Sequence, residues 1–165
     1  PDYCNIGSYF IQDDTPHQLL TYAEASFLKA EAAYKGYISG SPESYYNQGI
    51  RASFRQYGIT DNSVIDNYLQ GPAQYDPAKG LEQIHQQRWI ALYPNGREAW
   101  SLVRRTGHPE MMDPVFTFSG NEEMPRRVPY PVAERRYNKD NYQEAVSRMG
   151  GDSQYTRVWW DTQQQ

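Results

Sequence analysis

Residues 76–109 constrain the fold most, because helix start and stop signals alternate within this one stretch. Asp76 can accept a hydrogen bond from an unpaired amide of a helix whose first residue is Pro77, a position where proline loses nothing. Side chains suited to one helix face then recur at steps of three and four, at Leu81, Ile84, Arg88 and Leu92. Pro94 ends this run, so the pattern predicts one helix before it.

A second helix is predicted directly after this break. Asn95 and Glu98 have the spacing of a capping box, in which the two residues satisfy each other's amides. Trp100 and Val103 follow on the face that we expect to point inward. Gly107 ends the helix, because glycine readily adopts the left-handed conformation common at that position. The whole stretch is therefore predicted to form a helix, a tight break and a helix.

An antiparallel pair of helices is predicted upstream. The first opens with a hydroxyl cap at Thr15, a proline at Pro16 and a capping-box glutamine at Gln18, and it ends at Gly36. Its inward face is expected to carry Leu20, Ala23, Phe27, Ala30 and Tyr34. The second runs from Ser41 to Gly58 and is expected to turn inward Tyr46, Ile50, Phe54 and Tyr57. A short connection and small residues at the seam are typical of a tetratricopeptide-like hairpin.

The other segments are shorter. A helix is predicted over residues 62–69. Prolines exclude helix over residues 107–131, an ordered loop in which residues 115–118 form at most one short strand. A last helix is predicted from Asn138 to Gly150, with its inward face carrying Tyr142, Ala145, Val146 and Met149. The fold class is therefore all-α: a tetratricopeptide-like helical hairpin, further helices and a long proline-rich loop.

Length, charge and cysteine content limit the number of domains and the classes of partner. The length of 165 residues fits a single domain over residues 1–165. The net charge of −4 argues against nucleic acid as a partner, because that binding depends on a basic surface. Cys4 is the only cysteine, so no disulfide can form within the chain. No stretch resembles a membrane helix or a signal peptide, and because the chain begins with Pro1 we expect it to be a trimmed piece of a longer protein.

Catalysis is not indicated. The adjacent carboxylates of Asp13 with Asp14, and of Glu122 with Glu123, should point apart, whereas glycoside hydrolysis needs two carboxylates facing each other across a cleft. The three histidines show no metal-ligand spacing, and no residue pattern supports a nucleophile beside a base. We therefore expect no enzyme activity, no metal and no cofactor.

The aromatic residues divide into structural and binding candidates. The positions expected to stabilise the fold are Phe27, Phe54, Trp100, Arg104, Arg105 and Trp160. Arginines at a helix C-terminus, such as Arg104 and Arg105, favour the helix dipole and pair with carboxylates, and Arg126 and Arg127 are interpreted in the same way. Trp159 and Trp160 are expected to dock on the body. The ligand-binding candidates are Tyr75, Trp89, Phe116 and Phe118, which lie in loops or at the edge of an apolar stripe.

An ordered set of segments resembles the C-terminal part of SusD/RagB-family outer-membrane proteins. The segments are AEASFLKAEAAYKGY, YYNQGIRASFRQYGI, IHQQRWIALYPNGREAWSLVRRTGHP, MPRRVPYPVAERRYN and VWWD, and together they span nearly all of residues 20–161. The resemblance implies an all-helical, non-catalytic protein on tetratricopeptide-like hairpins. It further implies a lipid anchor at the surface of the Bacteroidetes outer membrane, and a SusC-like TonB-dependent transporter that receives oligosaccharides or peptides from the protein. Family members are about three times longer than this chain.

Two functions remain open from the sequence. One is the binding component of a glycan uptake complex, which captures nutrient and passes it to the transporter. The other is a tetratricopeptide-like adaptor that binds a peptide or a partner protein. Retardation in a starch, pullulan or xylan gel would favour the first.

Overall fold

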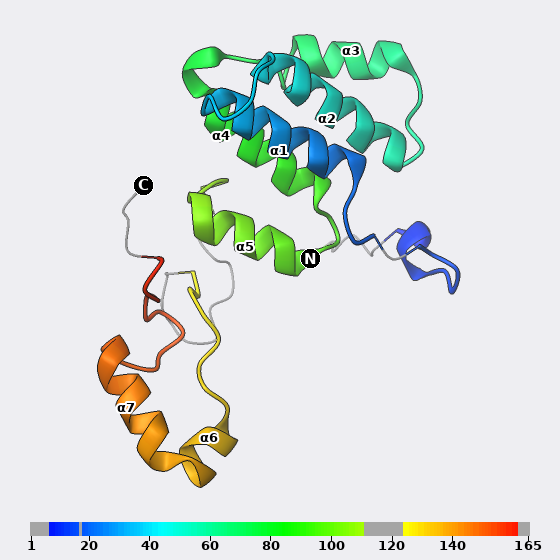
Figure 1. Ribbon diagram of the computed structural model, residues 1–165. Helices are drawn as coiled ribbons and strands as arrows, with labels where there is room; N and C mark the ends of the chain where they lie inside the picture. The colour runs from blue at the N-terminus through cyan, green and yellow to red at the C-terminus, as the bar shows by residue number, and fades with distance from the viewer. Residues whose placement is uncertain (1–6, 17, 111–123, 162–165) are drawn as a thin grey trace. The chain divides into compact units, whose positions relative to one another are not determined.

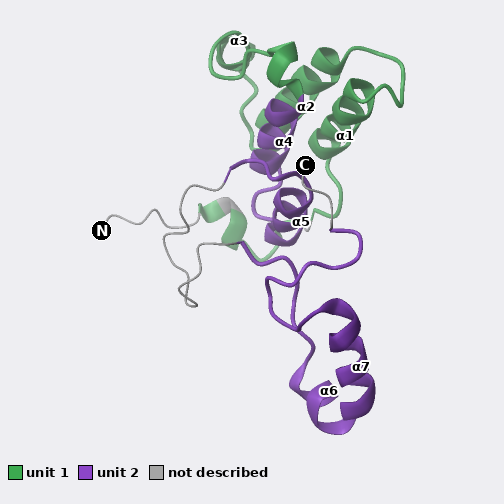
Figure 2. Ribbon diagram, turned by 90° about the vertical axis from the view of Figure 1, so that its left-hand side faces the viewer, with its two compact units in different colours: residues 1–80 green, residues 81–165 purple. Residues whose placement is uncertain are grey.

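The computed structural model describes residues 7–16, 18–110 and 124–161. The chain divides into two compact units, unit 1 over Pro1–Gly80 and unit 2 over Leu81–Gln165 (Figure 2). We describe each unit by itself, and the single domain over residues 1–165 stays a prediction. The described residues form helices joined by turns and loops, without a strand, which confirms the all-α class. No helix among them is long and apolar enough to span a bilayer.

Unit 1 is built on a helical hairpin, α1 (Tyr22–Tyr34) and α2 (Pro42–Gln56), whose helices pack side by side (Figure 1). Ala23 and Ala30 of α1 are buried, and Phe27 between them is inaccessible to solvent. Gly49 of α2 makes the close approach possible, because a Cβ atom placed there would lie 2.6 Å from Cε1 of Phe27. The Phe27 ring of α1 therefore packs directly against the backbone of α2 at Gly49.

The start of α1 differs from the prediction. Thr21, rather than Thr15, caps the helix, and its Oγ1 accepts a hydrogen bond from the amide of Glu24 at 3.1 Å. Thr15 with Gln18 and Thr21 with Glu24 both have the spacing of a capping box, and the helix begins at the second pair. Leu20 consequently precedes the helix and is exposed, and Tyr34 at the other end is also exposed. Placing these two side chains inward was wrong.

The other caps of unit 1 agree with the sequence. The Ser41 hydroxyl accepts from the amide of Ser44 at 3.2 Å, and the chain turns at Gly36 and Gly58 with positive φ angles of 74° and 79°. Glycine is suited to both positions because a Cβ atom strains this backbone conformation. α3 (Asn62–Gln70) follows, capped by Asp61, and packs on α2.

Tyr46 is the central side chain of unit 1. Its ring meets Phe27 edge-on with centroids 6.2 Å apart, and its hydroxyl donates a buried hydrogen bond to the Ala73 carbonyl at 3.1 Å. Burial raises the pKa of the Tyr46 phenol far above its ordinary value, so the hydroxyl remains a donor. This bond fixes the chain after α3 to the hairpin.

The helix, break and helix that the sequence predicts over residues 76–109 are present, and the boundary between the two units falls after Gly80, the first residue of α4. Asp76 caps a 3-10 turn (Pro77–Lys79) that leads into α4 (Gly80–Ala91), in which Ile84 and Arg88 are buried. α5 (Gly96–Thr106) begins at Asn95, whose Oδ1 accepts from the Glu98 amide at 3.3 Å. It ends at Gly107 in the left-handed conformation, with the Gly107 amide 2.7 Å from the Val103 carbonyl.

A second hairpin follows in unit 2. α7 (Lys139–Met149) begins after Asn138 and ends at Gly150, as predicted, with the expected residues half-buried: Tyr142, Ala145, Val146 and Met149. α6 (Val132–Tyr137), which packs on α7, is absent from the sequence prediction, because the neighbouring prolines argue against helix up to residue 131 and no start signal follows. The described parts of residues 107–131 are not helical, and the predicted strand at residues 115–118 lies outside the described residues.

Candidate functional site

The C-terminal end of α4 presents two aromatic side chains to solvent. Trp89 is 37% exposed and Tyr93, four residues on, is 51% exposed. The Leu92 amide bonds the Arg88 carbonyl at 3.0 Å, whereas the Tyr93 amide bonds the Ile90 carbonyl at 3.3 Å, so Tyr93 lies in the turn that closes α4. Trp89 is a candidate from the sequence. Tyr93 is not, because Pro94 directly after it indicates only the end of the helix.

Tyr75 lies in unit 1, in the turn before α4. Its ring packs on Tyr46 with centroids 5.3 Å apart, and burial is the main cause that raises the pKa of its phenol. Its hydroxyl also lies over Gly80, where an added Cβ atom would collide with it. Tyr75 is thus half-buried, and part of its ring is covered by Tyr46. Trp89, which belongs to unit 2, is exposed. Phe116 and Phe118 lie outside the described residues.

The structural candidates of unit 1 occupy two settings. Phe27 is fully buried in the hairpin, as described above. Phe54 is half-buried and packs on Tyr68 of α3, with ring centroids 5.2 Å apart. In these positions both rings are used for helix packing.

Arg104 of α5 lies between two tryptophan rings. Its guanidinium carbon is 4.2 Å from the Trp100 ring centroid and 4.7 Å from that of Trp160. Trp100 Nε1 donates to the Pro125 carbonyl at 2.8 Å, and Arg104 Nη1 donates to the Arg126 carbonyl at 2.7 Å. These contacts join α5, the segment at residues 124–130 and the C-terminal segment. Arg105, by contrast, is exposed.

Arg126 and Arg127 each pair with an aspartate near the C-terminus, as the carboxylate-partner interpretation predicted. Arg126 Nε donates to Asp161 Oδ2 at 2.8 Å, and its Nη2 bonds Oδ1. Arg127 Nη1 lies 3.2 Å from Oδ1 of Asp152. Their two amides also donate to one acceptor, the Gln154 carbonyl, at 2.7 and 3.2 Å.

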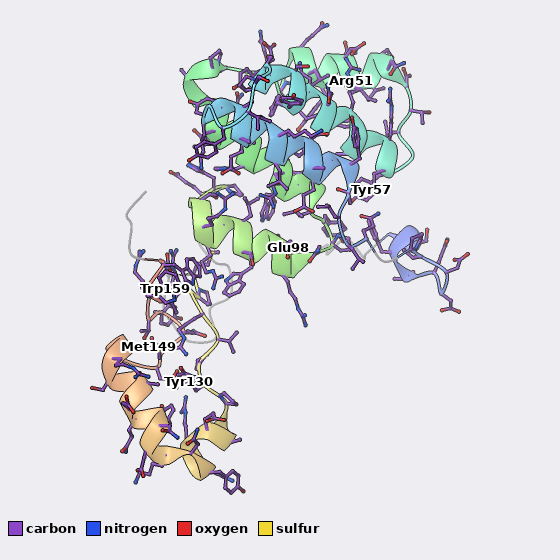
Figure 3. All side chains as sticks on the ribbon, in the orientation of Figure 1. Arg51, Tyr57, Glu98, Tyr130, Met149 and Trp159 are labelled. Atoms are coloured by element: carbon purple, nitrogen blue, oxygen red, sulfur yellow. The ribbon has the colours of Figure 1, made fainter. Side chains whose placement is uncertain are left out.

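Asp152 is a buried junction that the sequence did not reveal. Beyond Arg127, its Oδ2 accepts from Arg135 of α6 at 3.0 Å and from the Tyr142 hydroxyl of α7 at 3.0 Å, and its Oδ1 accepts from the Tyr130 amide at 3.0 Å. Burial alone would raise the pKa of this carboxyl, but the hydrogen bonds and the two guanidinium charges outweigh it and lower the pKa. Tyr130 and Met149 mark this region in Figure 3. The carboxylate oxygens of Asp152 therefore join the segment before α6, α6 and α7 to the chain that follows α7.

The first turns of α2 carry a shallow polar hollow of about 400 Å³ that the sequence did not suggest. It is lined by Ser41, Glu43, Ser44, Asn47, Gln48 and Arg51. Arg51 forms a salt bridge with Asp66 of α3, so its charge is already partly used. Within the described part of the chain, no three His, Cys, Asp or Glu residues are grouped to hold a metal ion.

Trp159 and Trp160 are adjacent but differ in environment. Trp160 packs on Arg104, whereas Trp159 is 87% exposed on the segment that follows α7 (Figure 3). The expectation that both tryptophans dock on the body is therefore wrong for Trp159. A turn explains the difference, because the Asp161 amide bonds the Val158 carbonyl at 2.9 Å and the two central side chains diverge.

Comparisons with solved structures identify relatives that match most of this chain. The Bacteroidetes AC2a SusD-like protein matches with a TM-score of 0.85 and 34% identity, over 95% of this chain and 33% of its own. A chitin-binding protein matches with a TM-score of 0.76 and 36% identity, over 86% of this chain and 33% of its own. A chitin-binding SusD homologue from Flavobacterium johnsoniae matches with a TM-score of 0.70 and 32% identity, over 86% and 36%.

The chain therefore spans about a third of the length of these relatives. The comparison with curated proteins found no match. A family model described as starch-binding and associating with the outer membrane matches residues 2–131. Together with the structural matches, this shows that the chain belongs to the SusD/RagB family of SusD-like proteins.

Proposed function

We propose that this protein is the non-catalytic, glycan-binding component of an outer-membrane nutrient uptake complex. It captures an oligosaccharide at the cell surface, where a lipid anchor holds it, and passes the sugar to a SusC-like TonB-dependent transporter. The observation that carries the proposal is the 36% identity to a chitin-binding protein over 86% of this chain. A second chitin-binding relative, the Flavobacterium johnsoniae homologue, points to the same ligand class. Chitin oligosaccharides are therefore the first ligands to test.

Trp89 of α4 and Tyr93 in the turn after it are the proposed contact residues. Both expose aromatic surface, and the flat face of an aromatic ring covers the apolar C–H face of a pyranose ring. Tyr75 is a weaker proposed contact, because its ring already packs on Tyr46. The proposal leaves Phe116 and Phe118 as candidates from the sequence.

Two carboxylates of unit 2, those of Asp152 and Asp161, are arranged unlike the catalytic pair of a hydrolase. A hydrolase would hold two carboxyl groups facing a substrate cleft, one of them as a proton donor with a raised pKa. Asp152 and Asp161 instead have lowered pKa values and are both paired with arginines. These two carboxylates are therefore occupied by internal structure.

Affinity electrophoresis tests the proposed function. Purified protein is run in gels containing soluble chitin, starch or xylan, and retardation by chitin is expected. The double variant Trp89→Ala with Tyr93→Ala should lose most of this retardation, whereas Tyr37→Ala should not, because this exposed tyrosine lies in the turn after α1. Absence of retardation in all three polysaccharides would contradict glycan binding and favour the adaptor hypothesis, which rests on the α1–α2 hairpin alone.

The transporter partnership needs a separate experiment. Co-purification of the tagged protein from outer membranes should recover a TonB-dependent transporter of SusC type in near-stoichiometric amount. Recovery of the protein alone, in detergent conditions that preserve other membrane complexes, would contradict the partnership without affecting the glycan result.

A further inference from the structure

Trp159 is highly exposed, as is Tyr137 of α6 in the same unit, but unlike Tyr137 it has a packed tryptophan as its neighbour. Its side chain is 87% exposed, while its neighbour Trp160 is in contact with Arg104. A tryptophan of this kind presents an apolar surface on the order of 150–250 Å². Large aromatic side chains with so much free surface commonly mark binding positions.

The backbone around Trp159 is fixed rather than free. Of the two residues that follow Trp159, Trp160 is stacked on Arg104 and Asp161 is bonded to Arg126. The amide of Asp161 closes a turn onto the Val158 carbonyl at 2.9 Å, and Arg157 Nη1 donates to the Asp161 carbonyl at 3.2 Å. The turn thus fixes the backbone from which the indole projects, so a ligand that stacks on the ring has no backbone segment to order.

We propose that Trp159 is a stacking platform for one pyranose ring of a chitin-type oligosaccharide. This inference rests on the proposed function, because the sugar class comes from the chitin-binding relatives. The indole offers a flat apolar face, and the β-linked N-acetylglucosamine ring offers a matching face of axial C–H groups. Half-exposed Arg157, two residues before Trp159, adds a hydrogen-bond donor in the same segment for sugar hydroxyl or acetamide oxygens.

Isothermal titration calorimetry with chitohexaose measures the affinity of the protein and its variants for this sugar. Trp159→Ala is expected to weaken binding at least tenfold, and Trp159→Tyr should restore most of the affinity because it keeps an aromatic face. Tyr137→Ala is the matched control, because Tyr137 of α6 is an equally exposed aromatic residue at 86%. It should leave the affinity unchanged.

The outcomes separate this inference from the proposed function. Equal affinity of Trp159→Ala and the unaltered protein would overturn the platform and leave glycan binding intact. Failure of the unaltered protein to bind chitohexaose or any other glycan would overturn both. A large fall in the thermal midpoint of Trp159→Ala, with affinity retained, would show that another surface of the protein covers this ring and would also overturn the platform.

Discussion

Arg126 holds Asp161 through two parallel hydrogen bonds, with Nε 2.8 Å from Oδ2 and Nη2 bonded to Oδ1. The Asp161 side chain is almost completely buried, and Arg126 is mostly buried. Two-point contact of this kind is specific to arginine, because the planar guanidinium matches the carboxylate geometry. The pair joins the segment before α6 to the end of the chain.

Removal of Asp161 should therefore destabilise unit 2. Asp161→Ala leaves a largely buried guanidinium without its carboxylate, and we expect a loss of about 2–4 kcal/mol in the free energy of unfolding. Urea denaturation measures this loss. Glu144→Ala is the control, because it breaks the exposed Glu144 to Arg148 pair of α7 and should cost less than about 0.5 kcal/mol. Similar losses in both variants would contradict a special role for the buried pair.

Acid pH should lower the stability of the region around Asp152 and Asp161. The hydrogen bond from Arg126 is the largest cause that lowers the pKa of Asp161, and the pKa of Asp152 is also below its ordinary value. Because both folded-state values lie below those of the unfolded chain, the unfolded chain binds more protons as the pH falls. The stabilisation is complete above about pH 5 and is lost as the pH falls through about 4 and below.

Thermal midpoints measured from pH 6 to pH 3 test this dependence. The midpoint should fall towards acid pH, and the fall should be smaller in Asp152→Asn, which cannot titrate at that position. An identical pH profile in this variant would mean that other groups control acid stability.

Gly49→Ala should destabilise the α1–α2 hairpin. The added Cβ atom would lie 2.6 Å from the Phe27 ring, so the ring or the helix must shift, at an expected cost of about 1–3 kcal/mol. Gly96→Ala is the matched control, because no atom lies within 4 Å of a Cβ atom there. The control should be neutral or slightly stabilising, since alanine has the higher helix propensity. Equal effects in chemical denaturation would contradict the close approach.

Tyr46→Phe isolates the buried hydrogen bond of unit 1. The phenylalanine ring keeps the contact with Phe27 but leaves the Ala73 carbonyl without this donor, at a cost of about 1–3 kcal/mol. Tyr37→Phe removes a hydroxyl from an exposed ring and should change stability by less than about 0.5 kcal/mol. Far-ultraviolet circular dichroism during urea denaturation distinguishes the two.

Local signals allowed much of the fold to be predicted. The caps at Ser41 and Asn95 and the ends at Gly58 and Gly107 depend on residues within three or four positions, and the structure has them where the sequence placed them. The start of α1 was misplaced because two local cap signals compete, and only packing of the following helix decides between them. Local chemistry therefore predicted helix existence better than helix beginnings.

The junctions of unit 2 could be predicted only in part. Arg126 and Arg127 suggested carboxylate partners, but their partners lie 35 and 25 residues further along the chain, as Asp161 and Asp152. No periodicity connects residues so far apart. For the same reason the sequence could not decide which of Trp159 and Trp160 is packed, because the answer depends on the position of Arg104.

All four tryptophans of the chain, at positions 89, 100, 159 and 160, lie beyond residue 80 and so within unit 2, whereas unit 1 contains tyrosine as its ultraviolet fluorophore. Emission excited at the red edge of indole absorption therefore reports the state of unit 2 alone. Helix content measured by circular dichroism reports both units. Coincidence of the two transitions in one denaturation experiment would show that the units melt cooperatively, and separation would resolve the stability of each without cutting the chain.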